Sequence, residues 1–249
     1  MLADESSFLC HSAVLRFKTL LATLYANVVA TSELQEGQMK NIPNIQVLQA
    51  FGTSIKSFDF MLCIDLEATC DELMEAENLR ALIVSPDEME TIEIGLAVID
   101  LRKMETVEVF QRYVRPVLHP TLTDFCTNLT SIKQADVDAA QSFPVVATEF
   151  TAFLQKYPNA LWGSWGDYDA DQLAADALRA SCAPMLRGVQ HLDIERSYRE
   201  IFACPSIGLR AAVEALGLNW SGQYHRGIDD AKNLADMVVL LLASSRKIA

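Results

Sequence analysis

Two carboxylates lie close together at the end of a short apolar run of the sequence. Asp65 and Glu67 occur in FMLCIDLEATC, directly after four apolar residues. If residues 60–66 form a strand, side chains two positions apart project to the same face, at its carboxyl end. Like charges beside a core need a cation to neutralise them, and hard oxygen ligands suit Mg²⁺ or Mn²⁺. The pair predicts a divalent-metal site, and the competing interpretation is two solvated charges.

A second acidic group follows the fourth predicted strand, at residues 160–165. Asp169 lies in WGSWGDYDADQL, with Asp167 and Asp171 on either side. Acidic residues also favour helix N-termini, where the macrodipole is positive. Asp169 is the preferred candidate because Tyr168 precedes it and Leu173 follows one helical turn later, which would fix its direction. Asp167 remains an alternative metal ligand.

The third group is a histidine followed five residues later by an aspartate. His225 and Asp230 lie in HRGIDDAKNLADMV, the first in a predicted loop and the second in the first turn of the last predicted helix. An ordinary histidine titrates near pH 6.5, so it can accept a proton from water at neutral pH. Taken alone, this segment would be interpreted as a surface histidine beside a helix-starting acid.

Together the three segments resemble the DEDDh 3′-5′ exonucleases, whose fold is ribonuclease H-like. The segment FCTNLTSIKQADVDAA, together with RSY and GIDDAKN, further resembles the Eri-type subfamily. That subfamily includes histone-mRNA and small-RNA exoribonucleases and bacterial relatives. The resemblance covers about residues 59–243, and its combined motifs are specific.

The resemblance implies a role for each of five residues. Asp65, Glu67, Asp169 and Asp230 would bind two divalent ions, Mg²⁺ with Mn²⁺ as a substitute, and His225 would act as the general base. The implied reaction hydrolyses RNA, or also single-stranded DNA, from the 3′ end. Its products would be nucleoside 5′-monophosphates.

Three further residues are weaker candidates for substrate binding. Phe125 and Leu129, matched to the Eri-type segment, are expected to stack against or wedge the terminal bases, since single strands are gripped through aromatic faces. The competing interpretation places both in the core. Glu93, in IEIG on the second predicted strand, is expected near Glu67, where it would assist the terminal nucleotide.

Two other functions stay open. A proofreading or repair DNA exonuclease could use the same scaffold, because the sequence does not reveal how the 2′-hydroxyl is treated. A non-catalytic nucleic-acid-binding subunit could keep the fold without activity. The presence of all five positions argues against the second alternative, because an inactive site has no physical need for clustered like charges.

The elements that must position these residues form an α/β fold with a mixed sheet flanked by helices. Strands are expected at residues 60–66, 91–101, 106–114 and 160–165, the first three as an antiparallel meander. Helices are expected at residues 124–129, 134–140, 142–157, 170–180, 195–202, 205–217 and 229–243. Residues 71–90 are interpreted as a loop.

Composition sets outer limits on the function. The chain has 249 residues, is 51% hydrophobic and carries a net charge of −13, which argues against holding nucleic acid by bulk electrostatics alone. Residues 59–179 contain 22 acidic and 8 basic residues, so the acidic excess surrounds the candidate metal ligands. Six cysteines without CxxC pairs predict a reducing compartment, and we expect the cytoplasm.

Residues 1–58 are expected to be an extension of unknown role ahead of an exonuclease domain at 59–249. Residues 13–30 are apolar with two basic residues near their start, which predicts an amphipathic accessory helix in preference to a secretion signal. No apolar tract reaches the length of about 20 residues that spans a membrane. A native start at Met39 or Met61 is a further alternative.

Overall fold

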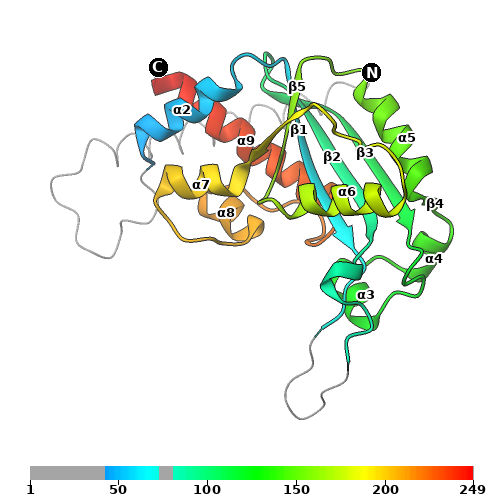
Figure 1. The fold of residues 1–249 in the computed structure, drawn as a ribbon. Coiled ribbons are helices and arrows are strands. Elements are labelled where there is room, and N and C mark those ends of the chain that lie inside the picture. The colour runs from blue at the N-terminus through cyan, green and yellow to red at the C-terminus, as the bar shows by residue number, and fades with distance from the viewer. Residues whose placement is uncertain (1–42, 73–80, 249) are drawn as a thin grey trace, which may run out of the picture.

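The computed structural model describes residues 43–72 and 81–248. Within these ranges a six-stranded sheet forms the centre of the molecule, with strand order β4-β3-β2-β1-β5-β6 (Figure 1). The strands are β1 (Phe60–Ala68), β2 (Thr91–Asp100), β3 (Glu105–Arg115), β4 (Gln141–Ser142), β5 (Ala160–Ser164) and β6 (Gln190–Asp193). β1, β2 and β3 pair antiparallel, whereas β5 runs parallel to β1 and to β6. The predicted mixed sheet is confirmed.

The two central strands are buried along almost their whole length. In β2, TIEIGLAVI is buried and only Asp100 is partly exposed. A strand covered on both faces reads as a nearly continuous apolar run, as this one does. The turn into β3 is held by the Asp100 carboxylate, which accepts the backbone N–H groups of Arg102 and Lys103 at 2.9 and 3.0 Å.

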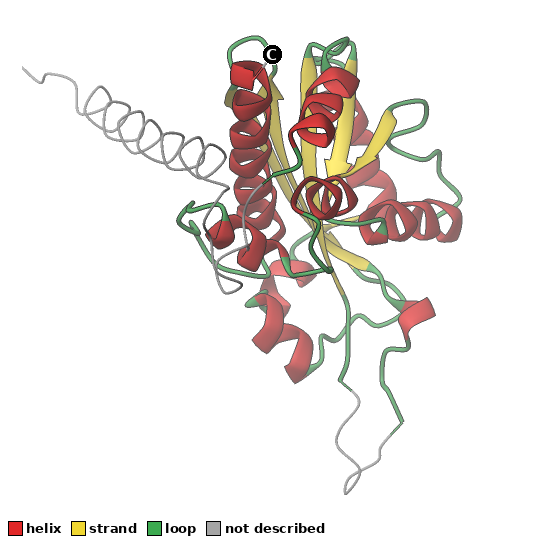
Figure 2. Cartoon of the chain, turned by 90° about the vertical axis from the view of Figure 1, so that its left-hand side faces the viewer, coloured by secondary structure: helices red, strands yellow, loops and turns green. Residues whose placement is uncertain are grey.

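Helices cover both faces of the sheet (Figures 1 and 2). One face packs against α9 (Gly227–Ile248), with α2 (Ile45–Ile55), α7 (Ile194–Phe202) and α8 (Leu209–Ala215) around it. The other face packs against α5 (Phe143–Leu154) and α6 (Tyr168–Arg179). Two short helices, α3 (Asp124–Thr130) and α4 (Gln134–Asp138), lie beyond the carboxyl end of β1. Each face of the sheet therefore has its own apolar core.

The predicted elements are present, with shifts at their ends. β1 continues to Ala68, so Glu67 lies within the strand, and α6 begins at Tyr168, so Asp169 lies in its first turn. The start predicted for α8 at 205 is wrong, because the helix begins at Leu209. The sequence prediction also missed β4, β6 and α2.

Helix α2 lies on the extension side of the predicted division at residue 58. Asn44 caps it by accepting the backbone N–H groups of Gln46 and Val47, and Leu48 and Phe51 are buried in the core that also includes α9. The division at residue 58 stays a prediction, although α2 packs on the core of the domain. The helix predicted at 13–30 lies outside the described residues. None of the described helices has the length and apolar character needed to span a membrane.

Candidate active site

The first two carboxylates lie at the carboxyl end of β1, where the sheet meets the start of α9. Asp65 is half-buried, and Glu67 is buried opposite Glu93 of β2. The backbone at the start of α9 approaches this edge closely. A Cβ built on Gly227 would lie 2.9 Å from the carbonyl oxygen of Asp65. Only a glycine lets the helix start come this near to the two acids.

Asp169 joins the same group from the other face of the sheet. Its Oδ1 accepts the backbone N–H of Leu66 at 2.9 Å, between the two acids of β1, and its side chain is buried. Asp167 points elsewhere, because its carboxylate is paired with Arg196 at 3.1 Å and faces His191 at 3.8 Å. The structure thus brings Asp169, and not Asp167, to the carboxylates of β1.

Asp230 and His225 complete the group from the start of α9. Ligand atoms of Glu67, His225 and Asp230 all lie within 4.8 Å of one another. Oδ2 of Asp230 accepts the backbone N–H of Arg226 at 3.1 Å. Its Oδ1 is buried and has no hydrogen-bond partner in the described part of the chain. The five residues predicted from three distant segments therefore meet at one edge of the sheet.

The clustering of acids makes their ionisation costly. Burial is the main cause that raises the pKa of Asp65, Glu67, Asp169 and Asp230, and neighbouring carboxylates raise the pKa of Asp65 and Glu67 further. For Asp169 and Asp230, the hydrogen bonds that the carboxylates accept from backbone N–H groups lower the pKa and partly offset the effect of burial. A group of acids held in this way is stabilised in its charged form by a cation.

His225 lies beside these acids as a neutral imidazole. Burial lowers the pKa of its imidazole, so the ring is neutral at pH 7 and a ring nitrogen can accept a proton. The ring packs against Tyr224 with centroids 4.0 Å apart and 34° between the planes. The backbone of His225 has φ of 60°, a left-handed conformation that is uncommon outside glycine and that occurs often in functional loops.

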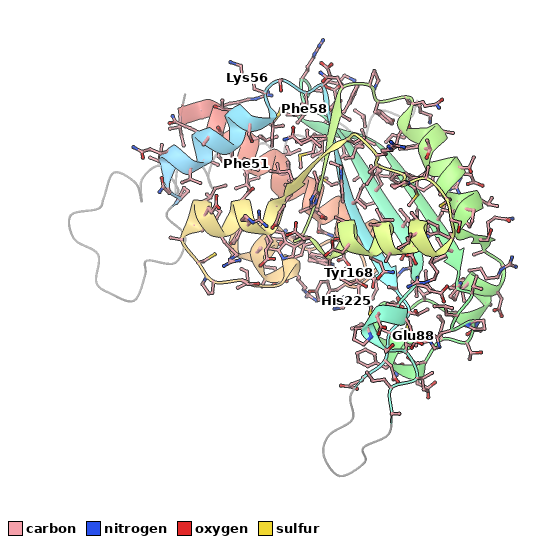
Figure 3. All side chains as sticks on the ribbon, viewed as in Figure 1. Phe51, Lys56, Phe58, Glu88, Tyr168 and His225 are labelled. Atoms are coloured by element: carbon pink, nitrogen blue, oxygen red, sulfur yellow. The ribbon has the colours of Figure 1, made fainter. Side chains whose placement is uncertain are left out.

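Above the acids lies a pocket of about 320 Å³ with partly apolar walls. Tyr168 and His225 lie at this end of the sheet, far from Lys56 and Phe58 (Figure 3). Besides the five candidate residues and their β1 neighbours Leu66 and Ala68, the lining includes Cys70, Met89, Leu129, Trp165, Tyr168, Gly208, Leu209 and Tyr224. Apolar walls can pack against a base, whereas the acidic floor can hold an anionic phosphate only when cations neutralise the carboxylates.

Comparison with known proteins agrees with this geometry. A family model described as Exonuclease (RNase_T) matches residues 62–238. The chain belongs to the exonuclease family. The 3′-5′ exonuclease eri1 of Schizosaccharomyces pombe is 30% identical over 222 residues, covering 76% of this chain and 71% of that protein. The human 3′-5′ exoribonuclease 1 is 30% identical over 195 residues, covering 74% of this chain and 53% of that protein.

A solved structure shares the fold of this exonuclease. The nuclease domain of 3′hExo, a DEDDh family member bound to rAMP, aligns with a TM-score of 0.66 and 29% identity, covering 75% of this chain and 92% of that one. The resemblance to DEDDh and Eri-type exonucleases predicted from the sequence is confirmed. The chain spans about half the length of this human relative.

The weaker substrate candidates are not equivalent in the exonuclease fold. Leu129 lines the pocket above the acids. Phe125, half-buried on α3, does not line that pocket, and its contact with substrate stays a prediction. Glu93 is completely buried, and its carboxylate is occupied by Arg226, Gly227 and Gln111. A direct contact between Glu93 and a nucleotide also stays a prediction, and nothing in the pocket supports it.

Sequence reasoning missed the residues that form much of the pocket wall. Tyr224 directly precedes His225, and its aromatic type next to a candidate base was a usable signal. Trp165, the last residue of the strand predicted at 160–165, was expected in the core. It follows the end of β5 and packs against the core, and its ring also borders the pocket while its indole donates to the carbonyl of Ile207. Leu209 carried no chemical signal, because apolar residues are usually found in cores.

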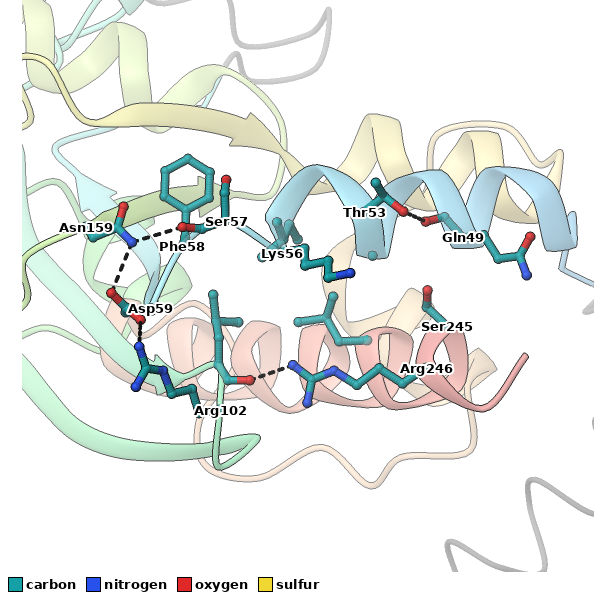
Figure 4. Close-up of a pocket in the computed structure, with 14 residues that line it drawn as sticks. Gln49, Thr53, Lys56, Ser57, Phe58, Asp59, Arg102, Asn159, Ser245 and Arg246 are labelled. Carbon is teal, nitrogen blue, oxygen red and sulfur yellow. Dashed lines mark hydrogen bonds and ion pairs between the residues drawn. The ribbon is translucent and has the colours of Figure 1, made fainter. Parts of the chain in front are cut away.

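A larger pocket of about 980 Å³ lies at the opposite end of β1, between α2, the β2–β3 turn and the end of α9 (Figure 4). Lys56 and Arg246 point into it, and Arg246 donates to the carbonyl of Leu101 at 2.6 Å. Its carboxylate, Asp59, is paired with Arg102 at 2.6 Å. Size does not decide which pocket is the exonuclease site, because the clustered acids and the histidine lie only at the smaller one.

The donor set of the smaller pocket fits divalent cations. Carboxylate oxygens are the ligands that Mg²⁺ and Mn²⁺ prefer. The unpartnered Oδ1 of Asp230, buried beside Glu67, has the chemistry of a ligand that awaits a cation. Exonucleases of the DEDDh type depend on divalent metals, and the residues present here satisfy that requirement.

Proposed function

We propose that this protein is a metal-dependent 3′-5′ exoribonuclease that releases nucleoside 5′-monophosphates. The observation that carries the proposal is the meeting of Asp65, Glu67, Asp169 and Asp230 beside a neutral His225. A phosphodiester is anionic and resists attack by hydroxide. The four carboxylates alone would repel the phosphodiester. They can support its hydrolysis when bound cations neutralise them.

The proposed metals are two Mg²⁺ ions, with Mn²⁺ as a substitute. Asp65, Glu67, Asp169 and Asp230 would hold them, each through oxygens that backbone groups leave free. Bound there, the ions would neutralise the scissile phosphate and increase the acidity of water. Oδ1 of Asp169 and Oδ2 of Asp230 are fixed by backbone N–H groups, which leaves the second oxygen of each side chain for this purpose.

His225 is the proposed general base. A ring nitrogen takes a proton from the attacking water, whose oxygen bonds to phosphorus while the bond from phosphorus to the 3′ oxygen breaks. The leaving 3′ oxygen takes a proton from solvent, so the products are a 5′-monophosphate and a strand with a new 3′-hydroxyl. Tyr224, stacked on the imidazole, holds the ring in place during this transfer.

RNA is the proposed substrate, with single-stranded DNA as a secondary one. Two relatives are named exonuclease and exoribonuclease, and the solved nuclease domain was bound to rAMP. Tyr168 and Leu129 in the pocket wall offer faces against which terminal bases can pack. This packing needs an unpaired end, because bases inside a duplex are already stacked.

A reducing compartment, proposed to be the cytoplasm, is supported by the cysteines. Cys63, Cys70, Cys126, Cys182 and Cys204 are free thiols in the structure. Proteins of oxidising compartments generally pair their cysteines.

The activity can be tested with strands of matched sequence labelled at the 3′ or the 5′ end. We expect Mg²⁺ or Mn²⁺ to support shortening of single-stranded RNA from the 3′ end with release of 5′-mononucleotides, and EDTA to stop it. DNA of the same sequence is expected to shorten more slowly. Faster hydrolysis of DNA would favour a repair exonuclease, and no cleavage by a folded sample would favour a binding subunit.

Metal binding should also be visible without turnover. We expect saturating Mg²⁺ to raise the melting temperature, because a ligand that binds only the folded state stabilises it by about 2.7 kcal/mol at 100 times its dissociation constant. The measurement is differential scanning fluorimetry with Mg²⁺ or EDTA. An Asp230→Asn variant, which loses a charge beside the unpartnered oxygen, should show a smaller rise. An equal rise in both proteins would contradict a metal site at Asp230.

A further inference from the structure

We propose that Glu93 and Arg226 form a buried clamp that positions His225 and the start of α9 over the metal-binding acids. The inference rests on the proposed exonuclease function, and it assigns to Glu93 a role different from a contact with the nucleotide. Both residues act through others, so they are positioning residues.

Glu93 fixes the backbone directly after His225. Its Oε2 accepts hydrogen bonds from Nε of Arg226 at 3.0 Å and from the backbone N–H of Gly227 at 3.1 Å. Gln111 of β3 donates to the other oxygen, Oε1, at 3.0 Å. One fully buried carboxylate on β2 therefore ties two consecutive residues of the α9 start to the sheet.

Arg226 links this clamp to the site. Its guanidinium reaches Glu93 and the hydroxyl of Tyr113, while its backbone N–H donates to Oδ2 of Asp230 at 3.1 Å. His225 precedes it in a left-handed conformation with φ of 60°. A residue in that conformation persists when its surroundings over-determine it, and the clamp supplies such surroundings on the carboxyl side of His225.

The clamp compensates the negative charge of Glu93 but not that of the neighbouring metal-binding acids. Glu93 lies directly opposite Glu67 in the β1–β2 register, yet it accepts from a guanidinium, a backbone N–H and a side-chain amide. Its charge is therefore compensated within the protein, whereas the charges of Glu67 and Asp230 are left for a cation. If Arg226 were removed, an uncompensated carboxylate would remain buried beside Glu67, which is strongly unfavourable.

The buried Glu93–Arg226 pair could serve only to stabilise the fold. The test therefore needs measurements that a loss of stability alone does not change. We would compare Glu93→Gln, Arg226→Gln and the double variant, with Tyr113→Phe as a milder change that removes only a hydroxyl. Glu149→Gln is the matched control, because it breaks a solvent-exposed Arg112 pair of 2.7 Å whose residues do not line the pocket above the acids. Circular dichroism and melting temperatures select the variants that fold.

Activity is the first readout, with kcat and KM measured on single-stranded RNA. We expect each single variant to lower kcat by about 10- to 100-fold, as removal of groups that orient ligands commonly does, with KM changed less than about threefold. The double variant should lose less than the product of the two single effects, because both remove the same pair. Tyr113→Phe should lie between the wild type and Arg226→Gln.

Hydrogen exchange is the second readout and does not depend on turnover. Peptides that cover residues 224–230 should exchange faster in Glu93→Gln and Arg226→Gln than in Glu149→Gln. Unchanged exchange, or a kcat no lower than that of Glu149→Gln, would overturn the clamp. If the wild type itself fails to shorten RNA while exchange responds as expected, the proposed function fails and the clamp remains a feature of the fold.

Discussion

Asp169→Asn and His225→Ala are both expected to abolish detectable turnover, while only the first weakens metal binding. The asparagine side chain would keep the volume and the acceptor for the backbone N–H of Leu66 but would remove a negative charge from the group. Loss of a general base alone commonly costs about 10²- to 10⁴-fold in rate. The two variants therefore separate a residue that holds a cation from one that moves a proton.

The measurement is isothermal titration of Mn²⁺ into each variant, alongside single-turnover hydrolysis of labelled RNA. Asp167→Asn is the matched control, two residues away in the same sequence motif. Its carboxylate is exposed and paired with Arg196, so this variant should keep both activity and metal affinity.

His225 makes the division of roles a sharp test. One of its ring nitrogens lies within the 4.8 Å group that also contains Glu67 and Asp230, so geometry alone allows it to be a ligand. If His225→Ala weakens Mn²⁺ binding as much as Asp169→Asn does, the histidine is a metal ligand and the general base must be sought elsewhere. If the two variants bind Mn²⁺ with the same affinity, Asp169 and His225 do not have the separate roles of metal ligand and general base.

Local patterns in the sequence located the three segments of the candidate site, whereas some elements around them carried no local signal. Asp65 and Glu67 come at the end of an apolar run, and His225 and Asp230 mark the start of the final apolar helix, so local patterns placed each segment. That the three segments meet followed from the family resemblance. The choice between Asp169 and Asp167 needed the structure, because it depends on a hydrogen bond across 103 positions to Leu66.

The missed elements lacked a local signal. β6 is a four-residue edge strand whose residues are exposed or half-buried, so neither alternation nor an apolar run marks it. Helix α2 was hidden because its apolar residues appeared to belong to an extension rather than to the core shared with α9. The partnership of Glu93 with Arg226 spans 133 positions, and no spacing rule reports such a contact.

Gly95→Ala is expected to destabilise the protein by about 3 kcal/mol, near the upper end of the usual cost of overpacking. A Cβ at this position of β2 would overlap the carbonyl carbon of Gly227 and the nitrogen of Ile228. Both are backbone atoms, so a rotamer change cannot relieve the clash. Urea unfolding followed by circular dichroism measures the loss.

Gly188→Ala separates this clash from backbone strain, because Gly188 has φ of +81° and open space around its Cβ position. That control should cost only about 1–2 kcal/mol, the usual penalty of a left-handed residue. If Gly95→Ala loses activity but little stability, the start of α9 must have moved off the sheet and carried His225 and Asp230 with it. If it loses neither, the close approach of α9 to β2 does not hold the site together.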